Sequence, residues 1–310
     1  MAGSNQTVVS EFILLGFSNL GQLQLLLFGV FLVAYLATLT GNTLIILLTK
    51  MDPALHSPMY FFLRNLSFAE VGFISSTVPK MLVDLLSEKK TISLLGCRAQ
   101  TYFFFFFGTI ECFLLIAMAY DRFVAICNPL RYPAVMNKNF CRMMVLAACA
   151  SGFPVGTIQS AWLFSFPFCG SNVILHFFCD TPPLLELACG DTSKFEQFSI
   201  IGTFTIILAP FTLILISYVR IISTILRMPS TEGRQKAFST CSSHIMVVTL
   251  FYGTASSIYF RPRSNYTPEI KQLLSLSYTV FTPMLNPVIY SLRNKEMKGA
   301  LSRLLSRKMN

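Results

Sequence analysis

Seven windows of about 20 or more mostly apolar residues constrain this chain more than any other feature of its sequence. They lie at 23–49, 58–82, 97–120, 141–164, 197–221, 237–260 and 271–292. A helix needs about 20 apolar residues to cross the hydrocarbon core of a bilayer. The chain is also 54% apolar and only 12% charged, which is unusual for a soluble domain. We therefore expect seven membrane-spanning helices, with the two termini on opposite sides.

The windows favour helices over the strands of a membrane barrel, because they are too long for such strands and lipid forces backbone groups to pair within each segment. The sequence thus predicts an all-α fold in which residues 23–292 form a seven-transmembrane helix bundle. Residues 1–22 would be an extracellular N-terminal tail, and residues 293–310 a cytoplasmic tail. Leucines alternate with basic residues over 294–308, which predicts a short amphipathic helix along the membrane surface.

Lysine and arginine fix the expected orientation. Fifteen of the 24 fall in segments on the same side as the C-terminus, and only five fall in the opposite segments. Basic loops stay cytoplasmic, so we expect the N-terminus to lie outside. The net charge of +10 then indicates contact with anionic lipid and an acidic partner surface, not with nucleic acid.

Four of the nine cysteines, Cys97, Cys169, Cys179 and Cys189, fall in segments assigned to the outside. An even set in an oxidising compartment predicts two disulfides, and the residues alone leave three pairings open. A structural metal site is not expected, because no histidine spacing accompanies these cysteines. Asn5 begins a glycosylation sequon in the exposed tail and is the favoured acceptor among three matches.

An adjacent acid and base, Asp121 and Arg122, end the third apolar window. Charges are costly in hydrocarbon, so the pair should lie where the helix reaches water. Taken alone, such a pair is more often a simple interfacial anchor. Here Phe123 follows it, and Cys127-Asn-Pro-Leu-Arg-Tyr132 comes soon after.

Together with 55–63, 236–244 and 283–294, these motifs resemble the signatures of odorant receptors, which are rhodopsin-like G protein-coupled receptors. The resemblance extends over nearly the whole chain, so 1–310 would be a single seven-transmembrane receptor domain. Two positions depart from the usual patterns. Phe123 stands where the family usually has tyrosine, and Tyr252 and Gly253 replace the Trp-Pro pair that most other rhodopsin-like receptors carry in the sixth span.

The resemblance implies an activity and a set of coupling residues. The protein would bind small volatile, mostly neutral hydrophobic odorants in the outer half of the bundle, and would activate a stimulatory heterotrimeric G protein of the olfactory type to raise cyclic AMP. It implies the disulfides Cys97–Cys179 and Cys169–Cys189. It assigns activation and coupling to Asp121, Arg122, Tyr218, His244, Asn286, Pro287 and Tyr290. A structural kink without a switching role remains the alternative for Asn286-Pro287, since this pair breaks a helical backbone bond in any case.

A stripe of the third span is the candidate ligand site. Its members recur at helical spacing: Phe104, Phe105, Gly108, Thr109 and Cys112. Ordinary helix packing would give the same stripe, but the resemblance places it beside the odorant pocket. The resemblance adds Gly202, Thr203, Ile206, Ser256, Tyr259 and Thr279 to the lining. Apolar walls with scattered hydroxyls suit neutral ligands, because a charged ligand would need a buried countercharge.

Two acids, Glu70 and Glu111, lie inside spans two and three. Intramembrane acids are functional candidates because their ionisation is costly. With Asn42 and Asn286 they resemble a site for a sodium ion or a proton, although Glu70 stands where aspartate is commoner. The alternative is a protonated, hydrogen-bonded structural carboxyl. No other cofactor is expected.

Other classes of membrane protein fit less well. A secondary transporter should show paired repeats, and the two halves of this chain show none. An enzyme would need a nucleophile and base or a metal cluster, but the three histidines, at 56, 176 and 244, are scattered. The remaining alternative is a non-olfactory rhodopsin-like receptor for a small lipophilic ligand. We therefore expect a receptor and not an enzyme.

Overall fold

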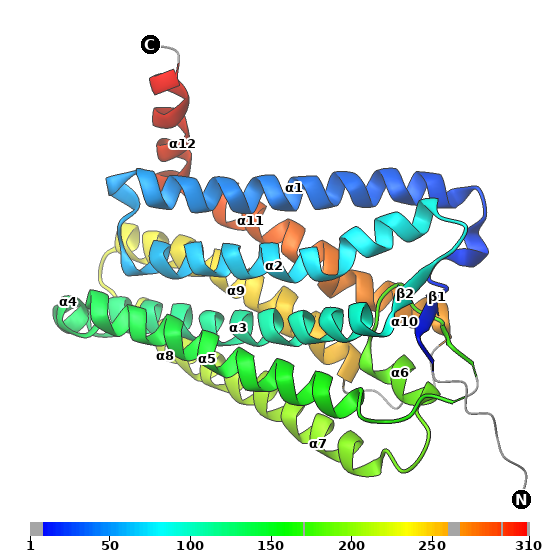
Figure 1. Cartoon of the computed structure of the whole chain (residues 1–310). Coiled ribbons are helices and arrows are strands. Elements are labelled where there is room, and N and C mark those ends of the chain that lie inside the picture. The colour runs from blue at the N-terminus through cyan, green and yellow to red at the C-terminus, as the bar shows by residue number, and fades with distance from the viewer. Residues whose placement is uncertain (1–8, 170, 260–266, 293, 309–310) are drawn as a thin grey trace, which may run out of the picture.

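A computed structural model describes residues 9–169, 171–259, 267–292 and 294–308. Long helices run along a common direction, and the strands gather at the end that holds the N-terminus (Figure 1). The bundle is built from α1 (Leu23–Met51), α2 (Pro58–Leu86), α3 (Leu94–Cys127), α5 (Lys138–Leu163), α7 (Ser193–Thr203), α8 (Ala209–Leu226), α9 (Thr231–Tyr259), α10 (Pro268–Leu276) and α11 (Thr282–Leu292). Two short helices, α4 (Tyr132–Val135) and α6 (Thr181–Leu187), lie in the connections.

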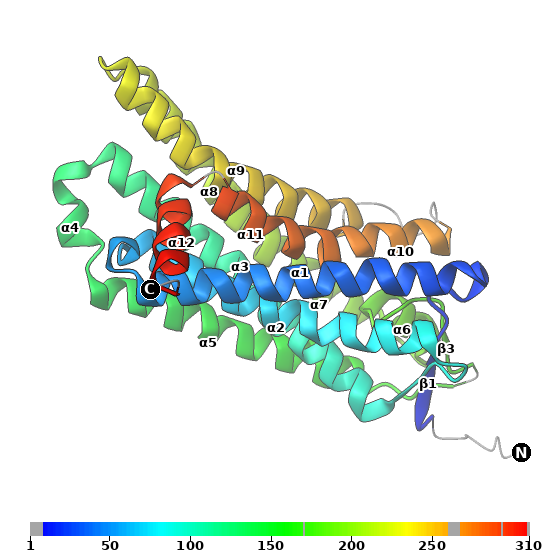
Figure 2. The same ribbon diagram turned by 90° about the horizontal axis from the view of Figure 1, so that it is seen from above.

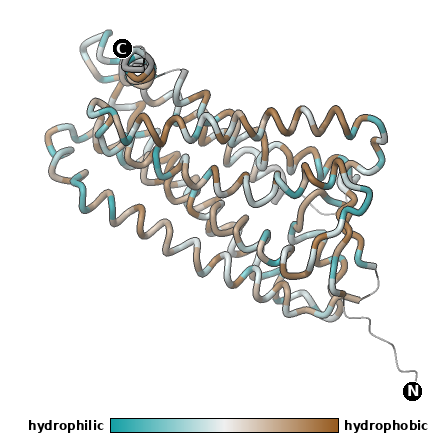
Figure 3. The backbone as a smooth tube through the Cα atoms, turned by 45° about the horizontal axis from the view of Figure 1, so that its top comes forward, coloured by the Kyte–Doolittle hydropathy of each residue, from teal (hydrophilic) through white to brown (hydrophobic). Residues whose placement is uncertain are grey.

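Each apolar window of the sequence coincides with helix. Within the described residues, four continuous helical stretches are long and apolar enough to cross a membrane: α1, α3, α5 and the stretch Ser193–Leu226. The α2 helix is long too, but it carries Arg64, Glu70, Lys80 and Asp84. Large apolar side chains on the outside of the bundle, such as Leu25, Leu146 and Val219, are exposed. Hydrophobic residues follow the helices and hydrophilic ones gather at their ends (Figure 3), which is typical of a protein in lipid.

The last helix, α12 (Lys295–Lys308), leaves the bundle crosswise at the end opposite to the N-terminus (Figure 2). It is fastened to the bundle at two points. The Tyr60 hydroxyl donates a hydrogen bond to Glu296, 2.7 Å away, and Arg303 pairs with Asp52 at 2.7 Å. The direction of α12 fits the amphipathic surface helix expected from the alternation of leucines and basic residues.

Two of the long helical stretches contain a π-helical segment. One, η4 (Phe204–Leu208), joins α7 to α8, and the other, η6 (Ser277–Phe281), joins α10 to α11. A π-helical segment shifts the rotation of the residues beyond it and is frequent at functional sites. Periodicity in the sequence predicted unbroken helices here.

The end of the bundle that holds the N-terminus carries a small sheet, where the sequence predicted only tails and loops. Its strands are β1 (Glu11–Leu14), β2 (Thr91–Ser93) and β3 (Val173–Ile174), in the order β2-β1-β3. Phe12 pairs with Ile92 in the antiparallel ladder, and Leu14 pairs with Ile174 in the parallel one. Phe12 and Leu14 are fully buried. Part of the expected N-terminal tail is therefore a strand whose apolar face closes the outer end of the bundle.

Glycines bring α5 against α3. A Cβ atom placed on Gly152 would lie 2.8 Å from the backbone oxygen of Phe106, and one on Gly156 would lie 2.9 Å from that of Tyr102. Side chains do not tolerate such short contacts. Small residues four apart thus let the two backbones approach closely, as is common between membrane helices.

Candidate ligand cavity and cytoplasmic coupling site

A cavity of about 90 Å³ lies between α2, α3, α5, the α7–η4 junction, α9 and η6. Seven of the residues expected to bind ligand line it: Phe104, Phe105, Gly108, Thr109, Cys112, Thr203 and Ile206. The stripe on α3 forms one wall. The two π-helical segments contribute Ile206 and Ile207 from η4 and Tyr278 from η6.

Other lining residues were not anticipated from the sequence. They are Phe73, Val155, Gln159, Ile207, Phe251, Ala255 and Tyr278. Gln159 is the most informative of them, because it is a buried amide on the apolar helix α5. Its side-chain oxygen accepts a hydrogen bond from Ser199, 3.2 Å away. A glutamine in the middle of an apolar window was the available signal, since a buried polar group needs a partner.

Three residues expected in the ligand site do not line this cavity. Gly202 and Ser256 are part-buried and do not line this cavity, and Thr279 is fully buried with its hydroxyl bonded to the Ser275 carbonyl at 2.7 Å. Gly202 lies in α7 just before η4, and Thr279 lies within η6. The Tyr259 side chain and Asn5 lie outside the described residues.

Tyr252 lies on α9, next to the cavity-lining residue Phe251. This fully buried residue stands at the position where this chain lacks the Trp-Pro pair of most other rhodopsin-like receptors. Its hydroxyl donates a hydrogen bond to the backbone oxygen of Cys112 at 3.2 Å, and its ring packs on Phe211 with the centroids 5.3 Å apart. Tyr252 therefore joins α3, α8 and α9 directly beside the cavity.

At the end of the bundle opposite to the N-terminus, Arg122 is held by its neighbour. Its Nε donates to Asp121 at 2.9 Å, and its Nη2 also pairs with that carboxylate. The Tyr132 hydroxyl donates to the other oxygen of Asp121 at 2.8 Å. Asp121 is fully buried, and the Arg122 side chain is 14% exposed. Burial, together with the negative charge of Asp121, raises the pKa of Tyr132, so its hydroxyl stays protonated as the donor.

A second pair joins α8 to α9 at the same end. The Tyr218 hydroxyl and the Nδ1 atom of His244 lie 2.5 Å apart, and the two rings stack at 5.7 Å. Both side chains are buried. The structure thus brings Asp121, Arg122, Tyr218 and His244 together.

The intramembrane acids meet in the middle of the bundle. The amide nitrogen of Asn286 donates to Glu70 at 2.5 Å, and Asn42 and Glu111 also lie close to the Glu70 carboxyl. Glu70, Glu111, Asn42 and Asn286 are all buried. Among the described residues, one oxygen of Glu111, the amide oxygen of Asn286 and the Tyr290 hydroxyl have no hydrogen-bond partner. Buried polar groups need partners, so this cluster can hold a proton, a cation or water.

Pro287 lies in α11, one residue after Asn286. It packs against α1, since a Cβ atom on Gly41 would lie 2.8 Å from the Pro287 Cβ. No group of three or more His, Cys, Asp or Glu that could hold a metal occurs among the residues the structure describes.

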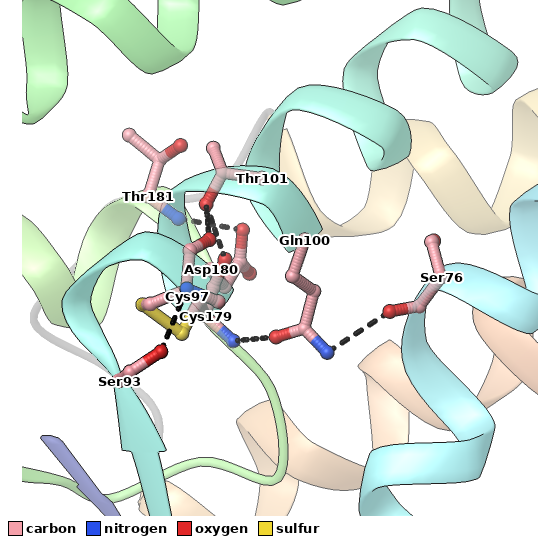
Figure 4. Close-up of a disulfide and its surroundings, with 9 residues drawn as sticks. Ser76, Ser93, Cys97, Gln100, Thr101, Cys179, Asp180 and Thr181 are labelled. Atoms are coloured by element: carbon pink, nitrogen blue, oxygen red, sulfur yellow. Dashed lines mark hydrogen bonds between the residues drawn. A yellow bond between two sulfur atoms is a disulfide. The ribbon is translucent and has the colours of Figure 1, made fainter. Parts of the chain in front are cut away.

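A loop is anchored to α3 near the cavity, and its Phe178 ring packs on the cavity-lining Phe104 with the centroids 5.4 Å apart. Cys97 is bonded to Cys179, and Cys169 to Cys189, in the pairing that the resemblance implied. Beside the first bond, Gln100 accepts from the Cys179 amide at 2.8 Å and donates to the Ser76 carbonyl at 3.0 Å (Figure 4). Thr101 donates to the Cys179 carbonyl at 3.2 Å. Gln100, which the sequence analysis did not single out, therefore ties the loop to both α3 and α2.

Two titratable groups of this loop are buried. Burial lowers the pKa of His176 to about 3, helped by the charge of Lys271, and the ring bonds to the Ser275 hydroxyl at 3.1 Å. Burial raises the pKa of Asp180 to about 6, opposed by a hydrogen bond from the Thr181 amide at 2.8 Å. These opposite shifts make both side chains favour their neutral forms.

Comparison with known proteins identifies one family over nearly the whole chain. Residues 31–308 match the family described as "Olfactory receptor". Olfactory receptor 10A5 of Homo sapiens is 61% identical over 98% of this chain and 96% of its own length. Olfactory receptor 10A4, also human, is 60% identical over 99% of this chain and 98% of its own length. Olfactory receptor 10A2, again human, is 60% identical over 94% of this chain and 97% of its own length.

Proposed function

Because this chain belongs to the olfactory receptor family, it is an odorant receptor of seven transmembrane helices and not an enzyme, and we propose the site and mechanism by which it works. The receptor lies in the plasma membrane as a single domain, with its N-terminus and the glycosylation site at Asn5 outside. The ligand site is the cavity beside the α3 stripe. The cytoplasmic partner is a stimulatory heterotrimeric G protein of the olfactory type, which raises cyclic AMP.

The observation that carries the ligand proposal is the character of the cavity. None of its described lining residues is charged, and most are apolar. A charged ligand would lose its hydration without gaining a countercharge. The volume of about 90 Å³ also lies below the roughly 300 Å³ at which ligand pockets usually begin. Both features support small, neutral, hydrophobic odorants, with Thr109, Gln159 and Thr203 available to orient one polar group.

The mechanism is a shift between two arrangements of the bundle. In the arrangement described here, Arg122 is held by Asp121, and Tyr218 and His244 hold α8 against α9. An odorant that contacts Phe251 and Ala255 acts directly on α9, and Tyr252 passes the change on to α3 and α8. Parting of the cytoplasmic ends would free Arg122 for the G protein. Odorant and G protein then strengthen each other's binding, because both favour the parted arrangement.

For the acid cluster we propose a single proton or sodium ion shared by Glu70 and Glu111, with Asn42, Asn286 and Tyr290 around it. Two carboxylates that approach each other inside a membrane cannot both keep their charge without compensation. The unpartnered oxygens of Glu111 and Asn286 support this occupancy. Parting of the helices around Asn286 and Pro287 would release the ion or proton.

The test is an odorant panel read out as cyclic AMP in transfected cells, with wild type and Gln159→Leu compared at equal surface expression. We expect responses to small neutral volatiles. The variant should lose about two- to tenfold in potency for alcohols and aldehydes, because a neutral hydrogen bond contributes about 0.5–1.5 kcal/mol. Alkanes of equal length should respond alike in both. A variant that loses all three series equally would show that Gln159 only supports the bundle.

A further inference from the structure

A second cavity, of about 350 Å³, opens at the cytoplasmic corner between α1, α2 and α5. It shares no lining residue with the ligand cavity. Four cations line it: Lys50, Arg64, Lys138 and Arg142. None of its described lining residues is acidic. Within the part of the chain that the structure describes, none of the four cations forms an ion pair with a carboxylate. The cavity is therefore a concentration of positive charge without a countercharge.

Arg64 is the cation of this cavity that lies deepest in the second membrane span. It is six residues beyond Pro58, or roughly 9 Å along the helix axis. Its guanidinium is half-buried and lies over the Phe61 ring, 5.4 Å from the centroid. A charged side chain at such a place is costly unless an anion meets it. The ring fixes the guanidinium at the cavity but does not supply that anion.

Two helix N-termini border the same cavity. The α2 helix begins at Pro58 after Ser57, and α5 begins at Lys138. The Ser57 side chain makes no capping hydrogen bond, so its hydroxyl remains available beside the cavity. Pro58 has no N–H, and the Asn137 side chain already accepts a hydrogen bond from the Phe140 amide at 3.0 Å, so the helix ends contribute mainly their partial positive charge, which favours an anion. The four cations and the two helix ends point to a phosphorylated ligand with more than one negative charge.

An apolar groove continues from this cavity along the outside of α5. It is shallow and open to the outside of the bundle, and it is lined by Arg142, Met143, Leu146, Ala147 and Ala150, with Asn139 at its start. Arg142 belongs to both the cavity and the groove. Leu146 is 68% exposed and faces outward from the bundle. A free phosphate ester or an acidic protein segment would use the cations and leave the groove empty, whereas a phospholipid would fill both.

We propose that this corner binds one anionic phospholipid of the cytoplasmic leaflet, with a phosphorylated inositol headgroup among Lys50, Arg64, Lys138 and Arg142 and an acyl chain in the groove along α5. Basic pockets between membrane helices on the cytoplasmic side favour such headgroups. The assignment to that leaflet rests on the proposed orientation, but the binding itself does not rest on odorant recognition. A bound lipid would join the start of α5 to α1 and α2.

The test uses the full-length receptor in nanodiscs of phosphatidylcholine, titrated with a fluorescent phosphatidylinositol bisphosphate. The double variant Arg64→Gln/Arg142→Gln is compared with Arg220→Gln/Arg227→Gln, which removes two exposed cations of the same cytoplasmic side outside the cavity. Each lost contact should weaken binding about fivefold. We expect the apparent Kd to rise about 25-fold in the cavity variant and less than about twofold in the control.

Further experiments distinguish a phospholipid from a soluble inositol phosphate and from an acidic protein surface. Met143→Ala/Leu146→Ala should weaken lipid binding several-fold, and soluble inositol trisphosphate should compete poorly. Equal losses in both arginine pairs would show diffuse attraction and overturn the proposal. Competition by inositol trisphosphate as strong as by the lipid would also overturn it. So would a cavity variant that keeps lipid binding and loses only G protein coupling, because an acidic protein surface would then be the ligand. If Arg64→Gln does not fold, Lys138→Gln/Arg142→Gln tests the same point with two exposed residues.

Discussion

The Tyr252 hydroxyl donates a hydrogen bond to the backbone oxygen of Cys112, 3.2 Å away, while Cys112 itself lines the ligand cavity. This bond fastens α9 to α3 at the cavity wall. Tyr252→Phe keeps the ring against Phe211 and deletes only the hydroxyl. The lost bond is worth about 0.5–1.5 kcal/mol, so the population of the parted arrangement should rise about two- to tenfold. Basal cyclic AMP at matched surface expression measures this.

The control for Tyr252→Phe is Tyr35→Phe, which removes a hydroxyl that pairs with Ser75 between α1 and α2, away from the cavity. It should leave basal activity unchanged. Equal basal activity in both variants and in wild type would mean that Tyr252 packs without linking the cavity to α9.

Arg122→Ala should abolish the cyclic AMP response and leave odorant binding largely in place. Arg122 is ten residues beyond Cys112 on α3, or roughly 15 Å further along its axis, so it cannot touch a ligand in the cavity. Arg131→Ala removes an exposed arginine next to Tyr132 and serves as the matched control. A normal response from surface-expressed Arg122→Ala would exclude a transducing role for this residue.

The helices were predictable because each shows as an apolar window of membrane length. The α3 wall of the cavity was predictable too, since Phe104, Gly108 and Cys112 recur at helical spacing. The sheet was not, because β1 pairs with strands roughly 80 and 160 residues away in the chain. A four-residue strand has too little periodicity of its own to be distinguished from a tail.

The cavity walls opposite α3 could not be predicted from the sequence. Gln159 and Phe251 line it because of how α5 and α9 are rotated, and a single sequence sets that rotation only weakly. The π-helical segments lie in other stretches of the bundle, where Ile206 of η4 and Tyr278 of η6 line the cavity and Thr279 of η6 does not. Contacts between distant residues, such as Tyr60 with Glu296, depend on tertiary packing and carry no local signal.

Gly108→Val should make the receptor selective for smaller odorants. A Cβ atom on Gly108 would lie 3.5 Å from the Phe73 ring, which is an ordinary contact, so the helix can accept a side chain. The added methyl groups would then occupy part of a cavity of only about 90 Å³. Dose–response curves for a homologous aldehyde series should shift most for the longest members. A uniform shift along the series would show that the substitution acts on the bundle.

Gly156→Val should destabilise the receptor whatever the ligand. Its Cβ would lie 2.9 Å from the Tyr102 backbone oxygen, and backbone atoms cannot move aside cheaply. Overpacking of this kind typically costs about 1–3 kcal/mol. Gly29→Val on α1 is the control, since nothing lies within 4 Å of its Cβ position. Thermal unfolding of the purified proteins should separate the two, and equal unfolding temperatures would contradict the close packing of α3 and α5.

The last prediction concerns pH and the outer loop. The pKa of His176 is lowered from 6.5 to about 3, so the stability linked to its neutral form is present above pH 6.5 and is lost as the pH falls. The pKa of Asp180 is raised from 3.8 to about 6, so the stability linked to its protonated form is present below pH 3.8 and is lost as the pH rises towards 6. Between about pH 4 and 6, the loss of stability caused by His176 as the pH falls is opposed by the gain caused by Asp180.

Removing either side chain should therefore reveal the pH dependence of stability that the other one causes. Asp180→Asn should lose stability by about 1.4 kcal/mol per pH unit as the pH falls from 6 to 4, because only the His176 slope remains. His176→Gln, whose amide can still bond to Ser275, should instead gain stability over the same interval. Wild type should change least of the three. Thermal unfolding of the detergent-purified receptors at pH 4, 5 and 6 measures the trend, and parallel curves for all three proteins would show that neither side chain is held neutral in the folded loop.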